Sequence, residues 1–230
     1  TGLNNFINDR LRCEDQMIVV FNPYTNAMYK LMNAHAIEIV EYIQQENSVK
    51  NYRWLLDHVA HAQGEEYQGQ YRRYWGFFRG KAATANFRDA YFQQLAQGLA
   101  NPPELADIVK LLYKVAGQTL QFSFCSKLCH MLDPHRPIYD AHIREFYWFS
   151  PPDGVNQNQA IRQRKINGYM EFYNFLIKEY QRVINNDLMG GCLNSFHDHF
   201  QEAQDVTDQR IIDFVIWGFV GLVQQGWSAH

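Results

Sequence analysis

A chain of 230 residues, 47% hydrophobic and 20% charged, is long enough to bury one large core or two closely packed lobes. No apolar run approaches the length of a membrane-spanning helix, and the first residues lack the order of a signal peptide. The scattered cysteines do not suggest a disulfide framework, so we expect a reducing, cytoplasmic setting. These cysteines are Cys13, Cys125, Cys129 and Cys192.

The net charge of −3 is unevenly distributed along the chain. Residues 1–70 carry 5 Lys and Arg against 9 Asp and Glu, residues 71–182 carry 15 against 9, and residues 183–230 carry 1 against 6. The net charges of the three segments are therefore −4, +6 and −5. A basic middle between two acidic ends keeps a nucleic-acid partner open in spite of the acidic total.

Hydrophobic residues recur at helical spacing along most of the chain, which predicts an all-α fold. The first helical stretch runs from Thr25 to Ile43, and Ser48 is a candidate N-cap for the next helix. Residues 17–21 are the one strand-like run, and segment 150–158 reads as a loop at a lobe boundary. Further helices are predicted at about 86–97, 103–115, 118–132, 140–149, 158–183 and 207–225.

Lys127 is the one charged residue of the predicted helix 118–132, whose circumference is mostly apolar. It belongs to a polar stripe, formed with Ser123, Ser126 and His130 at positions i, i+3, i+4 and i+7. A lysine held in apolar surroundings has a lowered pKa, and its neutral amine is a nucleophile. The alternative is a lysine whose amine extends along the stripe into solvent.

Two carboxylates downstream are also set in apolar surroundings. Asp140 begins a predicted helix, where Asp is a favoured N-cap, and a cap that fixes the carboxylate is compatible with catalysis. Asp213 is the only Asp, Glu, Lys or Arg among the final twenty residues, and Trp217 follows four residues later on the same helical face. A buried carboxylate needs a partner, so Asp213 either pairs with an arginine or faces a ligand pocket.

These segments together resemble the helix-hairpin-helix/Gly-Pro-Asp superfamily of DNA glycosylases, especially small divergent members related to 8-oxoguanine DNA glycosylases. The family hairpin Leu-Pro-Gly-Val-Gly-Thr-Lys ends in the catalytic lysine, and the run Gln121-Phe-Ser-Phe-Cys-Ser-Lys127 corresponds to it. The family motif Pro-Val-Asp-Val-His corresponds to Ile138-Tyr-Asp140-Ala-His142. Both hairpin glycines are replaced here, and no cysteine spacing typical of an iron–sulfur cluster is present.

The resemblance implies a single helical unit, 1–230, of two lobes with the active site in the cleft between them. One lobe, at about 48–150, holds the hairpin with Lys127 and Asp140, and the other combines 1–47 with 151–230. The target base is then flipped out of double-stranded DNA into the cleft. Lys127 attacks C1′ of the sugar, and Asp140 stabilises the charge that develops there. We expect a monomer that uses no metal and no cofactor.

The resemblance also implies further site residues. The base-binding set is Asp213, Trp217 and Tyr139. Because a carboxylate accepts hydrogen bonds, Asp213 favours a base with an amino or imino donor, such as a modified cytosine or an oxidised guanine. The residues expected to hold the DNA are His142, Arg144, Arg136, Arg72, Arg73, Ser123 and Cys125.

Several alternatives stay open at this stage. The arginine and aromatic run from Tyr71 to Phe78, with Arg79 and Lys81, is either a DNA-contacting surface or an amphipathic helix with buried aromatics and solvated arginines. The altered hairpin glycines favour a non-catalytic DNA-binding or regulatory module of the same fold. A metal hydrolase would rest on the pair His197-Asp-His199, but no HExxH motif is present. An enzyme of this kind serves either host repair or defence against modified viral DNA.

Overall fold

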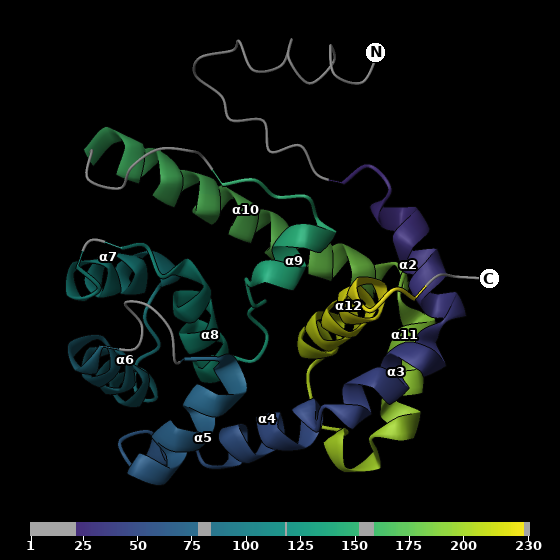
Figure 1. Ribbon diagram of the computed structural model, residues 1–230, viewed down its shortest axis with the longest axis horizontal. Helices are drawn as coiled ribbons and strands as arrows, with labels where there is room; N and C mark the ends of the chain where they lie inside the picture. Colours follow the sequence, from purple (N-terminus) through teal and green to yellow (C-terminus); the bar gives the residue numbers. More distant parts are fainter. Residues whose placement is uncertain (1–21, 78–83, 118, 152–158, 228–230) are drawn as a thin grey trace.

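The computed structural model describes residues 22–77, 84–117, 119–151 and 159–227, and its regular structure there is helical (Figure 1). This confirms the predicted all-α class. The strand-like run 17–21, Cys13 and the basic residues Arg79 and Lys81 lie outside the described residues.

The first helices differ from the prediction at their ends. The stretch expected to be continuous is divided at His35, whose φ of −119° and ψ of 27° interrupt it. The N-cap position of the following helix is Asn47 and not Ser48, so the predicted cap is wrong. Asn47 has a left-handed φ of 53°, and its side chain makes no capping hydrogen bond. The three helices are α2 (Thr25–Ala34), α3 (Ala36–Gln45) and α4 (Ser48–Asp57).

Helix α5 (Glu65–Trp75) contains the first part of the arginine and aromatic run. Tyr67, Tyr71 and Trp75 are buried at spacings of four residues, whereas Arg73 on the opposite face is exposed. The buried aromatics are those of an amphipathic helix, whereas contact of its arginines with DNA stays a prediction. It ends at Gly76, whose φ of 66° is the left-handed conformation typical of a C-terminal glycine.

Six of the later helices correspond to predicted ones. Helix α8 begins at Phe122, later than expected, and α9 ends at Phe146, before Trp148 takes a left-handed φ of 56°. Helix α11 was not predicted, because two glycines and only a few apolar residues leave little hydrophobic periodicity. The later helices are α6 (Ala85–Gly98), α7 (Leu105–Val115), α8 (Phe122–Leu132), α9 (Ala141–Phe146), α10 (Gln159–Asn185), α11 (Gly190–His199) and α12 (Asp208–Gln224).

The packing of the helices brings distant parts of the chain together (Figure 1). Helices α6, α7 and α8 pack on one another, while α12 packs against α3, α9, α10 and α11. Helix α9 was expected in the same lobe as α8, but its main contact is with α12. One hydrophobic cluster nevertheless includes buried residues from all of these helices. Asp140, just before α9, is thereby presented to α8 from the α12 side.

Candidate active site

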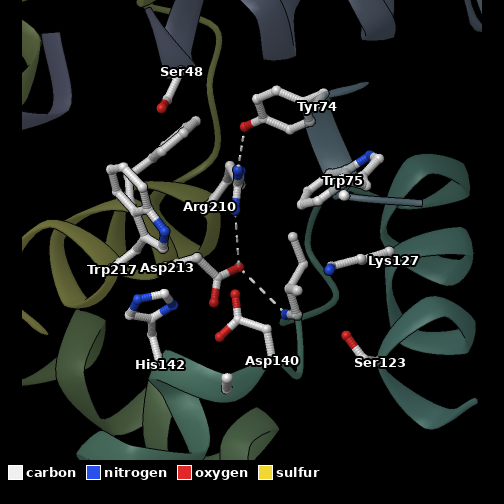
Figure 2. A pocket seen from close by; sticks show the side chains of 14 residues that line it. Ser48, Tyr74, Trp75, Ser123, Lys127, Asp140, His142, Arg210, Asp213 and Trp217 are labelled. Carbon is white, nitrogen blue, oxygen red and sulfur yellow. Dashed lines mark hydrogen bonds and ion pairs between the residues drawn. The ribbon is translucent and has the colours of Figure 1, made fainter. Parts of the chain in front are cut away.

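A central pocket of about 430 Å³ lies where α4, α5, α8, α9 and α12 meet (Figure 2). This volume is within the range typical of small-molecule sites. The pocket brings together predicted site residues that are far apart in the sequence, from Ser123 to Trp217. Six of the predicted site residues line it, namely Ser123, Lys127, Asp140, His142, Asp213 and Trp217.

Lys127 reaches the central pocket from α8, and only 8% of the residue is exposed. Its Nζ lies 5.2 Å from the centroid of the Trp75 ring and 5.3 Å from that of Phe124. Burial lowers the pKa of the lysine; nearby Asp140 raises it, and nearby Arg210 lowers it further. The alternative of an amine extended into solvent is therefore wrong, and the pocket favours the neutral, nucleophilic amine.

Asp140 is the N-cap of α9, as predicted. Its Oδ1 accepts a hydrogen bond from the backbone N–H of Ile143 at 2.9 Å. The cap fixes the carboxylate at the pocket wall, where Figure 2 shows it below Asp213, with Lys127 projecting toward the pocket from the opposite side. A fixed negative charge near a buried amine can stabilise positive charge that develops between them.

Ser126 and Asp213 hold the extended segment before Asp140 from two sides. The backbone N–H of Tyr139 donates to Ser126 Oγ at 3.0 Å, which ties the segment to α8. The N–H of Ile138 donates to Asp213 Oδ2 at 3.2 Å, which ties it to α12. The segment that positions Asp140 is therefore anchored to both walls of the central pocket.

His130 extends the same support behind the pocket. Its Nδ1 lies 2.7 Å from the carbonyl oxygen of Arg136, and its Nε2 lies 2.7 Å from the hydroxyl of Tyr52. The carbonyl can only accept, so Nδ1 carries the proton and Nε2 accepts from Tyr52. Complete burial lowers the pKa of His130 to about 3, and the imidazole is neutral. His130 therefore has a structural role, in which it links α8 to the carbonyl of Arg136 and to the hydroxyl of Tyr52.

Asp213 satisfies both alternatives drawn from the sequence, since it pairs with an arginine and also lines the central pocket. Its Oδ1 accepts from the hydroxyl of Tyr180 at 2.6 Å, and Arg210 Nη1 lies 3.8 Å from Oδ2. Desolvation raises the pKa of Asp213 to about 7, although Arg210 and the hydrogen bond from Tyr180 oppose the shift. Both carboxylate oxygens already have donors within the protein.

Arg210 is a pocket residue that the sequence analysis missed. Only 6% of it is exposed, and its Nη2 donates to the hydroxyl of Tyr74 at 2.6 Å. Its guanidinium carbon lies 3.8 Å from the ring centroid of Phe214, 4.6 Å from that of Tyr52 and 5.2 Å from that of Trp75. The available signal was that Arg210 is the single Lys or Arg of the acidic segment 183–230.

An aromatic pair forms another part of the pocket wall. The rings of Trp217 and His142 meet edge to face, with centroids 6.0 Å apart, and Trp217 also contacts Tyr42. Trp217 is half-buried, so part of its indole remains accessible within the pocket. An accessible aromatic face of this kind can stack on a planar ligand.

The other predicted site residues lie outside the pocket lining. Tyr139 points into the core, where its ring meets those of Phe122 and Tyr169. Cys125 is 1% exposed, and its N–H donates to a backbone carbonyl within the first turn of α8. Arg136 pairs with Asp133 at 3.3 Å. The full set outside the lining is Tyr139, Cys125, Arg136, Arg144, Arg72 and Arg73, of which Arg144 and Arg73 are exposed.

Other classes of site have little support in the described parts of the chain. There, no group of three or more His, Cys, Asp or Glu side chains is placed to hold a metal ion. The three described cysteines are free and buried. None of the described helices combines the length and apolar character that a membrane span requires. Comparisons of the chain with models of protein families, with curated proteins and with solved structures found no match.

Proposed function

We propose that this protein is a DNA glycosylase with AP lyase activity, built on a two-lobed helix-hairpin-helix fold whose interlobe cleft is the central pocket. The observation that carries the proposal is the shared pocket of Lys127 and Asp140: a buried amine of lowered pKa faces a carboxylate that a helix cap holds in place. These two residues occupy the positions of the family's catalytic pair in the sequence motif. Burial and pairing in one cleft suit a nucleophile and its stabiliser.

In the proposed reaction the lone pair of Lys127 Nζ forms a bond to C1′ of a flipped nucleotide. The bond from C1′ to the base breaks, and the base leaves with the bonding electrons and takes one proton from Nζ. The C1′–O4′ bond then opens as the second Nζ proton moves to O4′, which leaves an imine between Nζ and C1′. Loss of a C2′ proton expels the 3′ phosphate, and water releases the lysine. Asp140 stabilises the positive charge at the sugar in the first step.

Charge along the chain supports a DNA partner for this pocket. Lys127, Asp140 and His142 all belong to the basic segment 71–182, which carries a net charge of +6. Arg144, two residues beyond His142, is exposed and available to a phosphate. We expect modest DNA affinity, because the rest of the chain is acidic. This affinity should fall steeply with salt, because contacts to phosphates release counterions from the DNA.

Borohydride trapping tests the proposal, because hydride reduces the imine to a stable amine. The protein is incubated with duplexes that carry an abasic site or one of a panel of damaged and modified bases. We expect a covalent adduct that Lys127→Gln abolishes and that Lys114→Gln, a change at an exposed lysine of α7, leaves intact. Absence of an adduct with every duplex would remove the lyase mechanism and favour the non-catalytic DNA-binding module. Excision from modified phage DNA, but not from oxidised host-type lesions, would indicate the defence role.

A further inference from the structure

The hydrogen bonding of Arg210 is incomplete within the protein. A guanidinium has five N–H donors, and buried donors are nearly always satisfied. Among the described residues Arg210 donates to Tyr74, its distance of 3.8 Å to Asp213 is that of an ion pair and not of a hydrogen bond, and its Nε has no partner. With 6% of the residue exposed, the rest of the guanidinium edge lacks acceptors that the fold itself supplies.

The surroundings of Arg210 hold the guanidinium in one place. The rings of Phe214, Tyr52 and Trp75 lie around it, and the hydroxyl of Tyr74 fixes Nη2. Aromatic rings stabilise the cation but supply no strong acceptors to its N–H groups. Nε is fully buried, but Nη1 also makes no hydrogen bond among the described residues. Because Arg210 lines the central pocket, Nη1 is the group that can donate to whatever occupies the pocket (Figure 2).

The charges of the pocket indicate what kind of molecule carries that acceptor. The pocket lining contains two basic side chains, Lys127 and Arg210, and two acidic ones, Asp140 and Asp213. Arg210 shares the lining with two carboxyl groups, and burial lowers the pKa of Lys127, so the pocket has no excess of positive charge and does not favour a phosphate or another free anion. A neutral, planar molecule with a carbonyl oxygen satisfies Arg210 without adding charge, and its face can stack on Trp217.

We infer that Arg210, and not Asp213, selects the base, and that it selects one bearing a carbonyl oxygen on the edge that enters the pocket. This rests on the proposed function in that the occupant is a flipped nucleobase. It reverses the preference expected from Asp213, whose oxygens are engaged by Tyr180 and Ile138. Arginine is the usual donor to base carbonyls, because its planar fork matches adjacent acceptors.

The test uses free bases, so that its readout does not depend on excision. Hypoxanthine and adenine differ at C6, where one has a carbonyl oxygen and the other an amino group. Binding of each to the full chain is followed by NMR titration. We expect hypoxanthine to bind about 10-fold more tightly than adenine, in keeping with the discrimination that an arginine fork gives between bases.

Three variants complete the experiment. Arg210→Gln replaces the guanidinium by an amide that can donate to a carbonyl oxygen or accept from an amino group, and we expect it to reduce the preference to within about twofold. Tyr74→Phe removes the hydroxyl that orients the guanidinium, changes no charge, and is expected to reduce the preference in the same direction; it tests the inference if the Arg210 variant does not fold. Arg53→Gln, at a half-buried arginine of α4 that pairs with Asp205, is the matched control and should keep the preference.

Two results would overturn the inference: equal binding of the two bases by the unmodified protein, or a preference that survives both pocket variants. Failure of the proposed function gives a different combination of results. A protein that forms no borohydride adduct with any duplex, yet prefers hypoxanthine in an Arg210-dependent manner, has the keto-selective pocket without the lyase chemistry. A protein that forms the adduct but shows no such preference has the chemistry without this selectivity.

Discussion

Two buried titrating groups near the central pocket are expected to respond to pH in opposite directions. His130 is completely buried and its pKa is lowered from 6.5 to about 3, whereas the pKa of Asp213 is raised from 3.8 to about 7. A buried neutral His130 stabilises the fold above pH 6.5, and this stability is lost as the pH falls toward 3. Protonated Asp213 stabilises the fold below pH 3.8, and this stability is lost as the pH rises through 7.

The size of each effect follows from the two pKa values of each group. Between about pH 7.5 and pH 5, the unfolded chain takes up a proton at His130 and the folded chain does not, which lowers the free energy of unfolding by about 2 kcal/mol. Over the same interval the folded chain takes up a proton at Asp213 and the unfolded chain does not, which raises it by about 2 kcal/mol. In the unmodified protein the two contributions nearly cancel.

Single variants separate the two contributions. His130→Gln and Asp213→Asn replace each group by a neutral amide that does not titrate, and urea unfolding followed by circular dichroism measures stability at about pH 7.5 and pH 5. Relative to the unmodified protein, the deficit of His130→Gln should shrink by about 2 kcal/mol on acidification, and that of Asp213→Asn should grow by about as much. His135→Gln, at an exposed histidine, is the control.

The sign of each change is what tests the reasoning. The burial argument for His130 is refuted if the deficit of its variant stays constant or grows between the two pH values. A deficit of Asp213→Asn that shrinks on acidification would mean that the carboxylate is stabilised in the fold, against the dominant effect of desolvation. A deficit of His135→Gln that changes with pH would mean that the pH dependence does not arise from His130 and Asp213 alone.

Three further predictions concern the pocket and its surroundings. Ser126→Ala removes the acceptor for the segment that positions Asp140, so we expect stability to fall by about 1 kcal/mol in urea unfolding and adduct formation to slow while DNA affinity holds; an unchanged rate would contradict this. Lys127→Met should abolish the adduct yet raise stability by about 1 kcal/mol in the same assay, because a desolvated amine is removed; a loss of stability would argue against that burial penalty. Arg144→Gln should weaken DNA binding and lower the slope of log affinity against log salt by about one, whereas Arg164→Gln, on the exposed face of α10, should do neither; equal effects would leave Arg144 without a special place in the interface.

Hydrophobic spacing was sufficient to predict most helices, because an amphipathic face is a local property of the sequence. Hydrophobic spacing failed at His35, where the helix is interrupted although the apolar pattern continues from α2 into α3. It also failed for α11, whose position depends on neighbours such as α3 more than on its own few apolar residues. Tertiary packing decided these elements.

The same distinction applies to the candidate site: some residues could be recognised from the local sequence, whereas others depend on tertiary packing. Lys127, Asp140 and Asp213 were found because each is an isolated charge in apolar sequence, and the fold brings the three into one pocket. Tyr139 was expected in the site but lies outside the pocket lining, because successive side chains of an extended segment point to opposite sides, so that Tyr139 faces the core while Asp140 faces the pocket. Arg210 was missed because its hydrogen-bond partner Tyr74 lies 136 residues away.

The central claim is that Lys127 is the nucleophile, and mass spectrometry of the borohydride-trapped protein tests it most directly. A duplex with an abasic site is trapped, the DNA is digested to a short remnant, and peptides are sequenced to locate the added mass. We predict that the sugar remnant lies on Nζ of Lys127, and that the unmodified lysines include the exposed Lys110 and Lys114 of α7. A remnant on another lysine, or no remnant on the protein, would contradict the account.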